Sequence, residues 1–144
     1  MSTKLRTASW ALLTFEAVVL LAFGILSAYV AYGGQSFAVG GTPIEEIAAG
    51  DAALEAGMRG VRGTAAAYAV ACGVLMLGTA VGPYRGGSVA SWWTLLAALA
   101  ALALVTYLRV PTVGTQGGVA AAAILFGFGT VALLLDVGRL RSGR

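Results

Sequence analysis

The chain is 144 residues long, 59% of its residues are hydrophobic, only 10% are charged, and the mean hydropathy is +0.89. A soluble domain usually has about 25% charged residues, so this composition excludes an ordinary soluble protein and indicates a single domain built within a lipid bilayer. The net charge of +3 does not indicate nucleic-acid binding, because the basic residues stand at the ends of apolar runs and form no patch with aromatic residues.

Four apolar runs follow one another along the chain, and each is close to the ~20 residues that a helix needs to cross the hydrocarbon core. None shows the two-residue alternation of a membrane β-barrel strand, so helices are expected throughout. The sequence therefore predicts an all-α fold over 1–144, an integral membrane four-helix bundle. Its spans are expected at about 10–32, 63–82, 90–108 and 118–135.

The first run follows Lys4 and Arg6, but it is too long for a signal peptide and no Ala-x-Ala site ends it, so we expect a retained span. Glu16 lies well inside this span. An acid at that depth indicates either a packing residue that fixes the helix register or a relay for protons or cations. Three threonines at similar depth complete a predicted membrane-embedded polar layer with Glu16, and their hydroxyls could bond its carboxyl group: Thr79, Thr94 and Thr130.

The connection 33–62, between the first two spans, carries signals of a short external helix. Thr42, Pro43 and Glu45 fit an N-cap, a first-turn proline and the returning acid of a capping box. The following glycine, Gly50, is expected to end this helix.

A second helix is predicted to begin at Asp51 and to run without interruption into the second span. Glu55 and Arg59 are four residues apart, in the order that favours a helical ion pair. We expect the segment 43–58 to fold back as a lid, with Glu55 on Arg59 and at least one other acid on Arg62 or Arg109.

The arginines at the outer ends of the second and third spans predict an outer vestibule. Arg59 and Arg62 share a helix face, and Arg109 ends the third span. Together with Tyr68 and Tyr107 they would form a cationic, aromatic-rimmed mouth for a carboxylate or a lipid phosphate. The alternative is that nearby acids only neutralise these arginines: Glu45, Glu46, Asp51 and Glu55.

Small residues in the spans predict close helix packing, either within one bundle or between copies of the chain. The predicted contact faces include Gly73 and Gly78, the 97–103 alanine-rich stretch, and Gly118, Ala122, Gly127 and Gly129. After the last span, Asp136 and Arg139 are three residues apart and are expected to form an anchoring ion pair at the interface.

The distribution of Lys and Arg predicts the orientation. Six of these residues fall on one side of the bundle and three on the other, and the positive-inside rule places the larger set in the cytoplasm. Both termini are then cytoplasmic in a cell membrane, and the 33–62 connection is external. The larger set is Lys4, Arg6, Arg85, Arg139, Arg141 and Arg144, and the aromatic residues expected at the same interface are Trp10, Tyr84, Trp92 and Trp93.

The residue types favour a protein without a cofactor and without catalytic activity. The chain has no histidine and a single cysteine, Cys72, so metal sites, haem sites and disulfides built from this chain alone are not expected. The expected partners are the lipid bilayer and either a membrane protein or further copies of this chain.

The stretches "MRGVRGTAAAYAVACGVLMLG" and "YRGGSVASWWTLLAALAAL" resemble small four-span prokaryotic membrane proteins of the DoxX-like kind. This resemblance implies a four-span fold and accessory roles beside redox or transport systems. The stretch "WALLTFEAVVLL", with Glu16 in the first span, is similar to small multidrug exporters, although the long outer connection departs from them. We therefore expect an accessory or structural subunit of a larger membrane complex, with a small-solute or proton-coupled carrier using Glu16 as the alternative.

Overall fold

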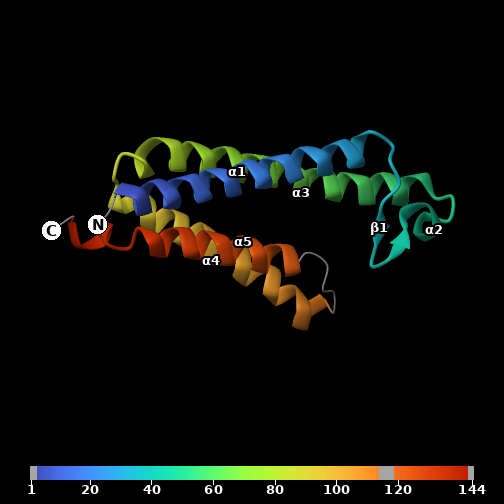
Figure 1. Cartoon of the computed structure of the whole chain (residues 1–144). Coiled ribbons are helices and arrows are strands. Elements are labelled where there is room, and N and C mark those ends of the chain that lie inside the picture. Colours follow the sequence, from blue (N-terminus) through green and yellow to red (C-terminus); the bar gives the residue numbers. More distant parts are fainter. Residues whose placement is uncertain (1–2, 114–118, 143–144) are drawn as a thin grey trace. The chain divides into compact units, whose positions relative to one another are not determined.

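The computed structural model describes residues 3–113 and 119–142, and they are predominantly helical, which confirms the all-α prediction. Figure 1 follows the elements along the chain. The helices are α1 (Thr3–Tyr32), α2 (Ile44–Ala48), α3 (Ala52–Thr79), α4 (Val89–Val113), α5 (Val119–Leu135) and α6 (Arg139–Ser142), with a π-helical turn η1 at Ala80–Tyr84. Two short strands, β1 (Ala38–Val39) and β2 (Thr42–Pro43), pair antiparallel between α1 and α2.

Three helical segments are long and apolar enough to cross a membrane: α1, α3 continued by η1, and α4 up to Leu108. Helix α5 is also apolar but has 17 residues, a length of about 25 Å at ~1.5 Å per residue. The predicted run 10–32 ends where α1 ends, and the run 118–135 ends where α5 ends. The protein is therefore a helical membrane protein by the length and composition of its helices.

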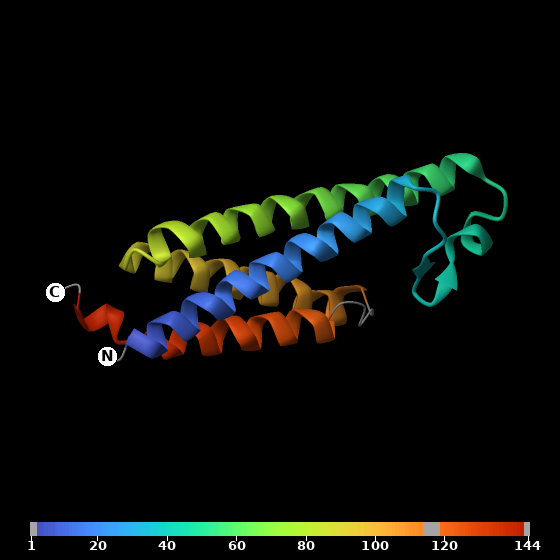
Figure 2. The same ribbon diagram turned by 45° about the horizontal axis from the view of Figure 1, so that its top comes forward.

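The described chain forms two compact units, Met1–Val18 with Leu75–Arg144 and Val19–Val74. In the Val19–Val74 unit, the second half of α1 lies against residues 63–73 of α3, and Figures 1 and 2 both show the two helices side by side. Two glycines allow this approach. A Cβ atom at Gly24 would lie 2.9 Å from the backbone nitrogen of Val70, and one at Gly73 would lie 3.0 Å from that of Leu21.

The other unit has a core formed by α1, η1, α4 and α5, with α4 and α5 side by side. Two aromatic residues predicted at the membrane interface belong to this core instead. Tyr84 is fully buried and shares a 2.6 Å hydrogen bond with the Ser9 hydroxyl. The indole nitrogen of Trp92, also buried, donates to the carbonyl of Leu133 at 3.0 Å. Their polar atoms thus find partners inside the protein, which makes deep burial favourable.

Proline explains the π-helical turn that ends α3. Pro83 has no backbone N–H, so the usual bond to the carbonyl four residues earlier is missing, and the register widens. The amide of Arg85, two residues after Pro83, donates to the carbonyl of Ala80, five residues back. This turn directs Tyr84 into the core and precedes the tight turn at Gly87, where φ is +99°.

The predicted helix in the connection 33–62 is present as α2, but the predicted capping box is not. Thr42 and Pro43 form β2, and no side chain caps the first turn of α2. Gly40 and Gly41, both with positive φ, make the turn between β1 and β2. Two other predictions for this segment are confirmed, because Gly50 has φ +87° after α2 and the Asp51 carboxylate accepts the amides of residues 53 and 54, at the start of α3.

Candidate functional site

Residues 33–51, which comprise β1, β2, α2 and their turns, are hereafter the cap, and Arg59 on α3 holds it. The Arg59 guanidinium donates to the carbonyl of Gln35 at 2.9 Å and to Glu55 Oε1 at 2.8 Å. It also lies 3.9 Å from Glu45 Oε1 in α2 and 5.7 Å from the centre of the Phe37 ring. One side chain, 17% exposed, therefore joins both the start of the cap and α2 to α3. The predicted Glu55–Arg59 pair is confirmed.

A second acid, Glu45, meets Arg59, whereas the prediction placed a second acid on Arg62 or Arg109. The Arg62 guanidinium stacks on the Phe37 ring with 4.4 Å between its central carbon and the ring centre. The Nε of Arg62 is buried and makes no hydrogen bond. For Arg62, an aromatic face thus takes the place of the carboxylate, and an acid on Arg109, the other predicted possibility, stays a prediction because that side chain lies outside the described part of the chain.

Glu45, in α2, is the charged group of the cap that contacts Arg59. Its own backbone amide and the Ser36 hydroxyl, 2.8 Å from Oε2, stabilise the charged carboxylate, and the positive charge of Arg59 adds to their effect. These contacts lower the pKa of Glu45 below its usual value. At neutral pH the contact between Glu45 and Arg59 therefore joins two opposite charges.

The predicted outer vestibule is only partly described. Arg59 and Arg62 both face the cap through Phe37, and Tyr68, on the same helix, is exposed. Tyr107 is also exposed, and the side chain of Arg109 lies outside the described part of the chain. The convergence of all five residues stays a prediction.

Glu16 is buried in the unit that contains α4 and α5, with 4% of its surface exposed. Its Oε2 atom makes no hydrogen bond. Gly129 of α5 leaves room for it, since a Cβ atom at that position would lie 2.8 Å from Oε2 and 2.4 Å from a methyl carbon of Leu99. A carboxyl group buried at such a site needs a hydrogen-bond partner or a cation to offset the cost of its burial.

The threonines of the predicted polar layer do not bond Glu16. The hydroxyls of Thr79 and Thr94 donate to backbone carbonyls four residues earlier in their own helices, those of Leu75 at 2.7 Å and Ala90 at 3.0 Å. The Thr130 hydroxyl is buried and makes no hydrogen bond. The hydrogen-bonded layer is therefore wrong for Thr79 and Thr94, because local bonding along the helix satisfies them.

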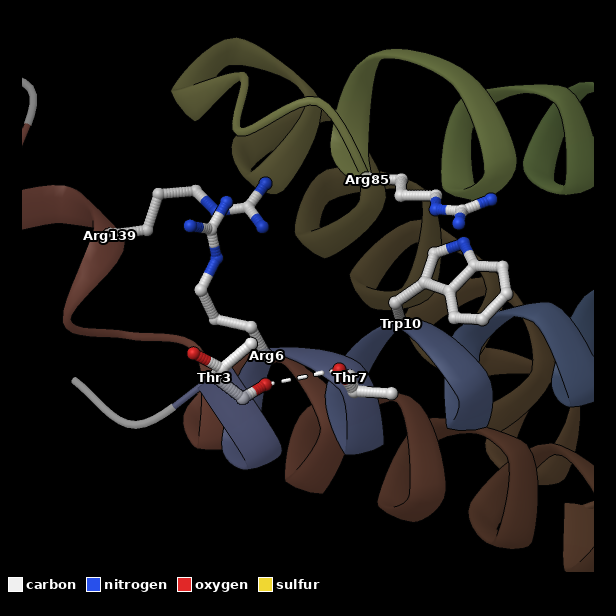
Figure 3. A pocket seen from close by; sticks show the side chains of 6 residues that line it. All are labelled: Thr3, Arg6, Thr7, Trp10, Arg85 and Arg139. Carbon is white, nitrogen blue, oxygen red and sulfur yellow. Dashed lines mark hydrogen bonds between the residues drawn. The ribbon is translucent and has the colours of Figure 1, made fainter.

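A second candidate site, not predicted from the sequence, is a pocket of about 290 Å³ in the unit that contains both chain ends. Figure 3 shows its lining. We call it the arginine pocket, and its residues are Thr3, Arg6, Thr7, Trp10, Arg85 and Arg139. They come from the first turns of α1, from the turn after η1 and from the start of α6, so three segments far apart in the sequence supply one arginine each.

Packing fixes two of these arginines. Arg139 pairs with Asp136, lies over the Tyr84 ring at 4.1 Å and donates to the Tyr84 carbonyl, so the predicted pair with Asp136 is confirmed. Arg85 lies over the indole ring of Trp10, with 4.7 Å between its central carbon and the ring centre. Arg6, Arg85 and Arg139 belong to the six basic residues from which the orientation was predicted. Counting those residues cannot show which of them lie together in the fold.

Comparison of the chain with protein-family models, with curated proteins and with solved structures finds no match. The resemblances drawn from the sequence therefore stay predictions.

Proposed function

We propose that this chain is a four-span integral membrane protein of the cell membrane that serves as a non-enzymatic accessory or structural subunit of a larger membrane assembly. The observation that carries the proposal is the folded cap. Arg59 ties the cap to α3 through a hydrogen bond to Gln35, an ion pair with Glu45 and a ring contact with Phe37, so the cap offers a fixed surface. A preformed surface binds a partner without the entropy cost of ordering a loop.

The cap also has the mixed surface expected of a docking site. Val39 of β1 and Leu54, next to the cap on α3, are each 46% exposed, and Glu45 and Glu46 add two acids beside them. Interfaces usually combine such apolar contacts with a polar rim. A carrier that loads solute from outside would instead need this segment to open.

Four spans, with both termini in the cytoplasm, agree with the arginine pocket. In an up-and-down bundle, the start of α1, the end of α3 and the end of α5 lie on the same membrane side. The pocket is lined from these three places. The basic residues there belong to the set that the positive-inside rule assigns to the cytoplasm.

The carrier reading has one specific observation in its favour, the unbonded carboxyl oxygen of Glu16 beside Gly129. One comparison of two variants separates the functions. Arg59→Gln removes the charge that holds the cap, and Glu16→Gln removes the buried acid while keeping most of its hydrogen-bonding capacity.

We expect native mass measurement of complexes extracted in mild detergent to show the heteromeric assembly with the unaltered chain and with Glu16→Gln. Arg59→Gln should shift most of the chain to the free form, and hydrogen exchange across residues 44–48 should become at least about tenfold faster in that variant. A free homodimer for the unaltered chain, with proton-driven flux in proteoliposomes that Glu16→Gln abolishes, would replace this proposal with the carrier.

A further inference from the structure

We propose that the arginine pocket binds a phosphate group, supplied either by the headgroup of an anionic lipid or by free phosphate. This inference concerns residues of the other unit, not the cap, and does not depend on the accessory role. Its basis is an excess of positive charge and of hydrogen-bond donors in one small cavity.

The charges in the pocket are not balanced. Of its three arginines, Arg139 pairs with Asp136, whereas Arg6 and Arg85 make no ion pair with any carboxylate in the described part of the chain. Figure 3 shows the guanidinium groups of Arg6 and Arg139 close together, with that of Arg85 over the Trp10 ring. Like charges brought together repel each other, and an anion between them would reverse the sign of this interaction.

Two N–H groups without a partner also point to an acceptor. The indole N–H of Trp10 is buried and makes no hydrogen bond, and the same is true of Nε of Arg139. Buried donors without partners are rare in folded proteins, because each costs the loss of its bond to water. The Thr7 hydroxyl already donates its proton to the Thr3 carbonyl at 3.0 Å, so the arginine and tryptophan N–H groups are the donors left for a ligand.

Phosphate fits these donors better than a carboxylate does. It has more acceptor oxygens, and guanidinium groups bind it through two parallel hydrogen bonds. The volume of about 290 Å³ is at the lower end of the ~300–1,000 Å³ common for ligand sites, so it suits a headgroup or a free ion. Anionic lipids of the cytoplasmic leaflet would present such groups at this depth.

The test uses the full-length protein in maltoside micelles and follows its thermal unfolding midpoint during titration with one of three probes. These are dioctanoyl phosphatidic acid, dioctanoyl phosphatidylcholine and sodium phosphate at constant ionic strength. We expect saturable stabilisation by phosphatidic acid at concentrations where the zwitterionic lipid has none. Equal stabilisation by sodium phosphate would also support the site and would assign free phosphate as its source.

Matched variants locate the binding. Arg85→Gln and Arg6→Gln should each weaken the apparent affinity by roughly tenfold, the loss expected for a charged hydrogen bond. Trp10→Phe keeps the aromatic ring under Arg85 but removes the unbonded N–H, and should weaken it about threefold. Lys4→Gln also removes one positive charge from the start of α1, but outside the pocket, and should change the apparent affinity by no more than about twofold.

Two results would overturn the proposal. One is the absence of stabilisation by both phosphatidic acid and sodium phosphate. The other is an equal loss with Lys4→Gln and Arg85→Gln, which would show attraction to a basic surface rather than binding in the pocket. If Arg85→Gln lowers the midpoint without ligand, Trp10→Phe carries the comparison.

Discussion

Replacing Asp136 with alanine is expected to lower the free energy of unfolding by about 3–5 kcal/mol, the usual loss when one partner of a buried ion pair is removed. Asp136 is fully buried, and the side chain of its partner Arg139 is 6% exposed. The variant would leave the guanidinium buried beside Tyr84 without a counter-charge. Equilibrium unfolding by dodecyl sulfate in mixed micelles measures the difference.

The control is the same substitution at an exposed aspartate. Asp51→Ala removes the N-cap side chain of α3, and we expect a loss of about 1 kcal/mol in the free energy of unfolding. A double variant, Asp136→Leu with Arg139→Met, should regain most of the stability, because it removes both charges together. Equal losses for the two alanine variants would show that the pair at Asp136 does not stabilise the fold.

The second large effect is expected at Gly24, where alanine should cost about 2–3 kcal/mol through overpacking. The added methyl group would meet both the backbone nitrogen and the side chain of Val70, within 3 Å of each. Backbone atoms cannot move alone, so α1 and α3 would have to separate within their unit. The same unfolding titration measures the loss.

Gly78→Ala is the matched control for Gly24→Ala. Gly78 lies in α3, and a Cβ atom there would meet nothing within 4 Å. Alanine also has the higher helix propensity, so this variant should be neutral or more stable by up to about 1 kcal/mol. A loss as large as that of Gly24→Ala would mean that the effect comes from the helix itself and not from the contact with Val70.

The sequence predicted the long helices well because the hydrocarbon core sets a strong requirement on length and polarity. It predicted the packing faces less well. Gly73 is a close contact and Gly78 is not, although both were expected to be. The two are five residues apart, about 140° around the helix at ~100° per residue, so they cannot share one flat contact. Gly24 was missed because a lone glycine has no spacing to test.

The cap shows the same limit on a smaller scale. Gly40 and Gly41 between short runs are a hairpin signal, but the capping-box pattern around Thr42 competed with it. The hairpin prevails because its turn uses both positive-φ glycines, while α2 forms without a side-chain cap. The arginine pocket was beyond prediction for another reason, since Arg6, Arg85 and Arg139 meet only through tertiary packing.

Labelling of single cysteines from outside intact cells tests the central claim, a four-span protein with an external cap, most directly. Three variants in a Cys72→Ala background each carry one new cysteine. The cysteine replaces Ala38 in the cap, Gly86 in the turn after η1, or Ser142 near the C-terminus. We expect an impermeant maleimide to label position 38 at once and positions 86 and 142 only after the membrane is opened. Labelling of position 142 from outside, with position 86 protected, would contradict the claim, because it would mean that α5 does not cross.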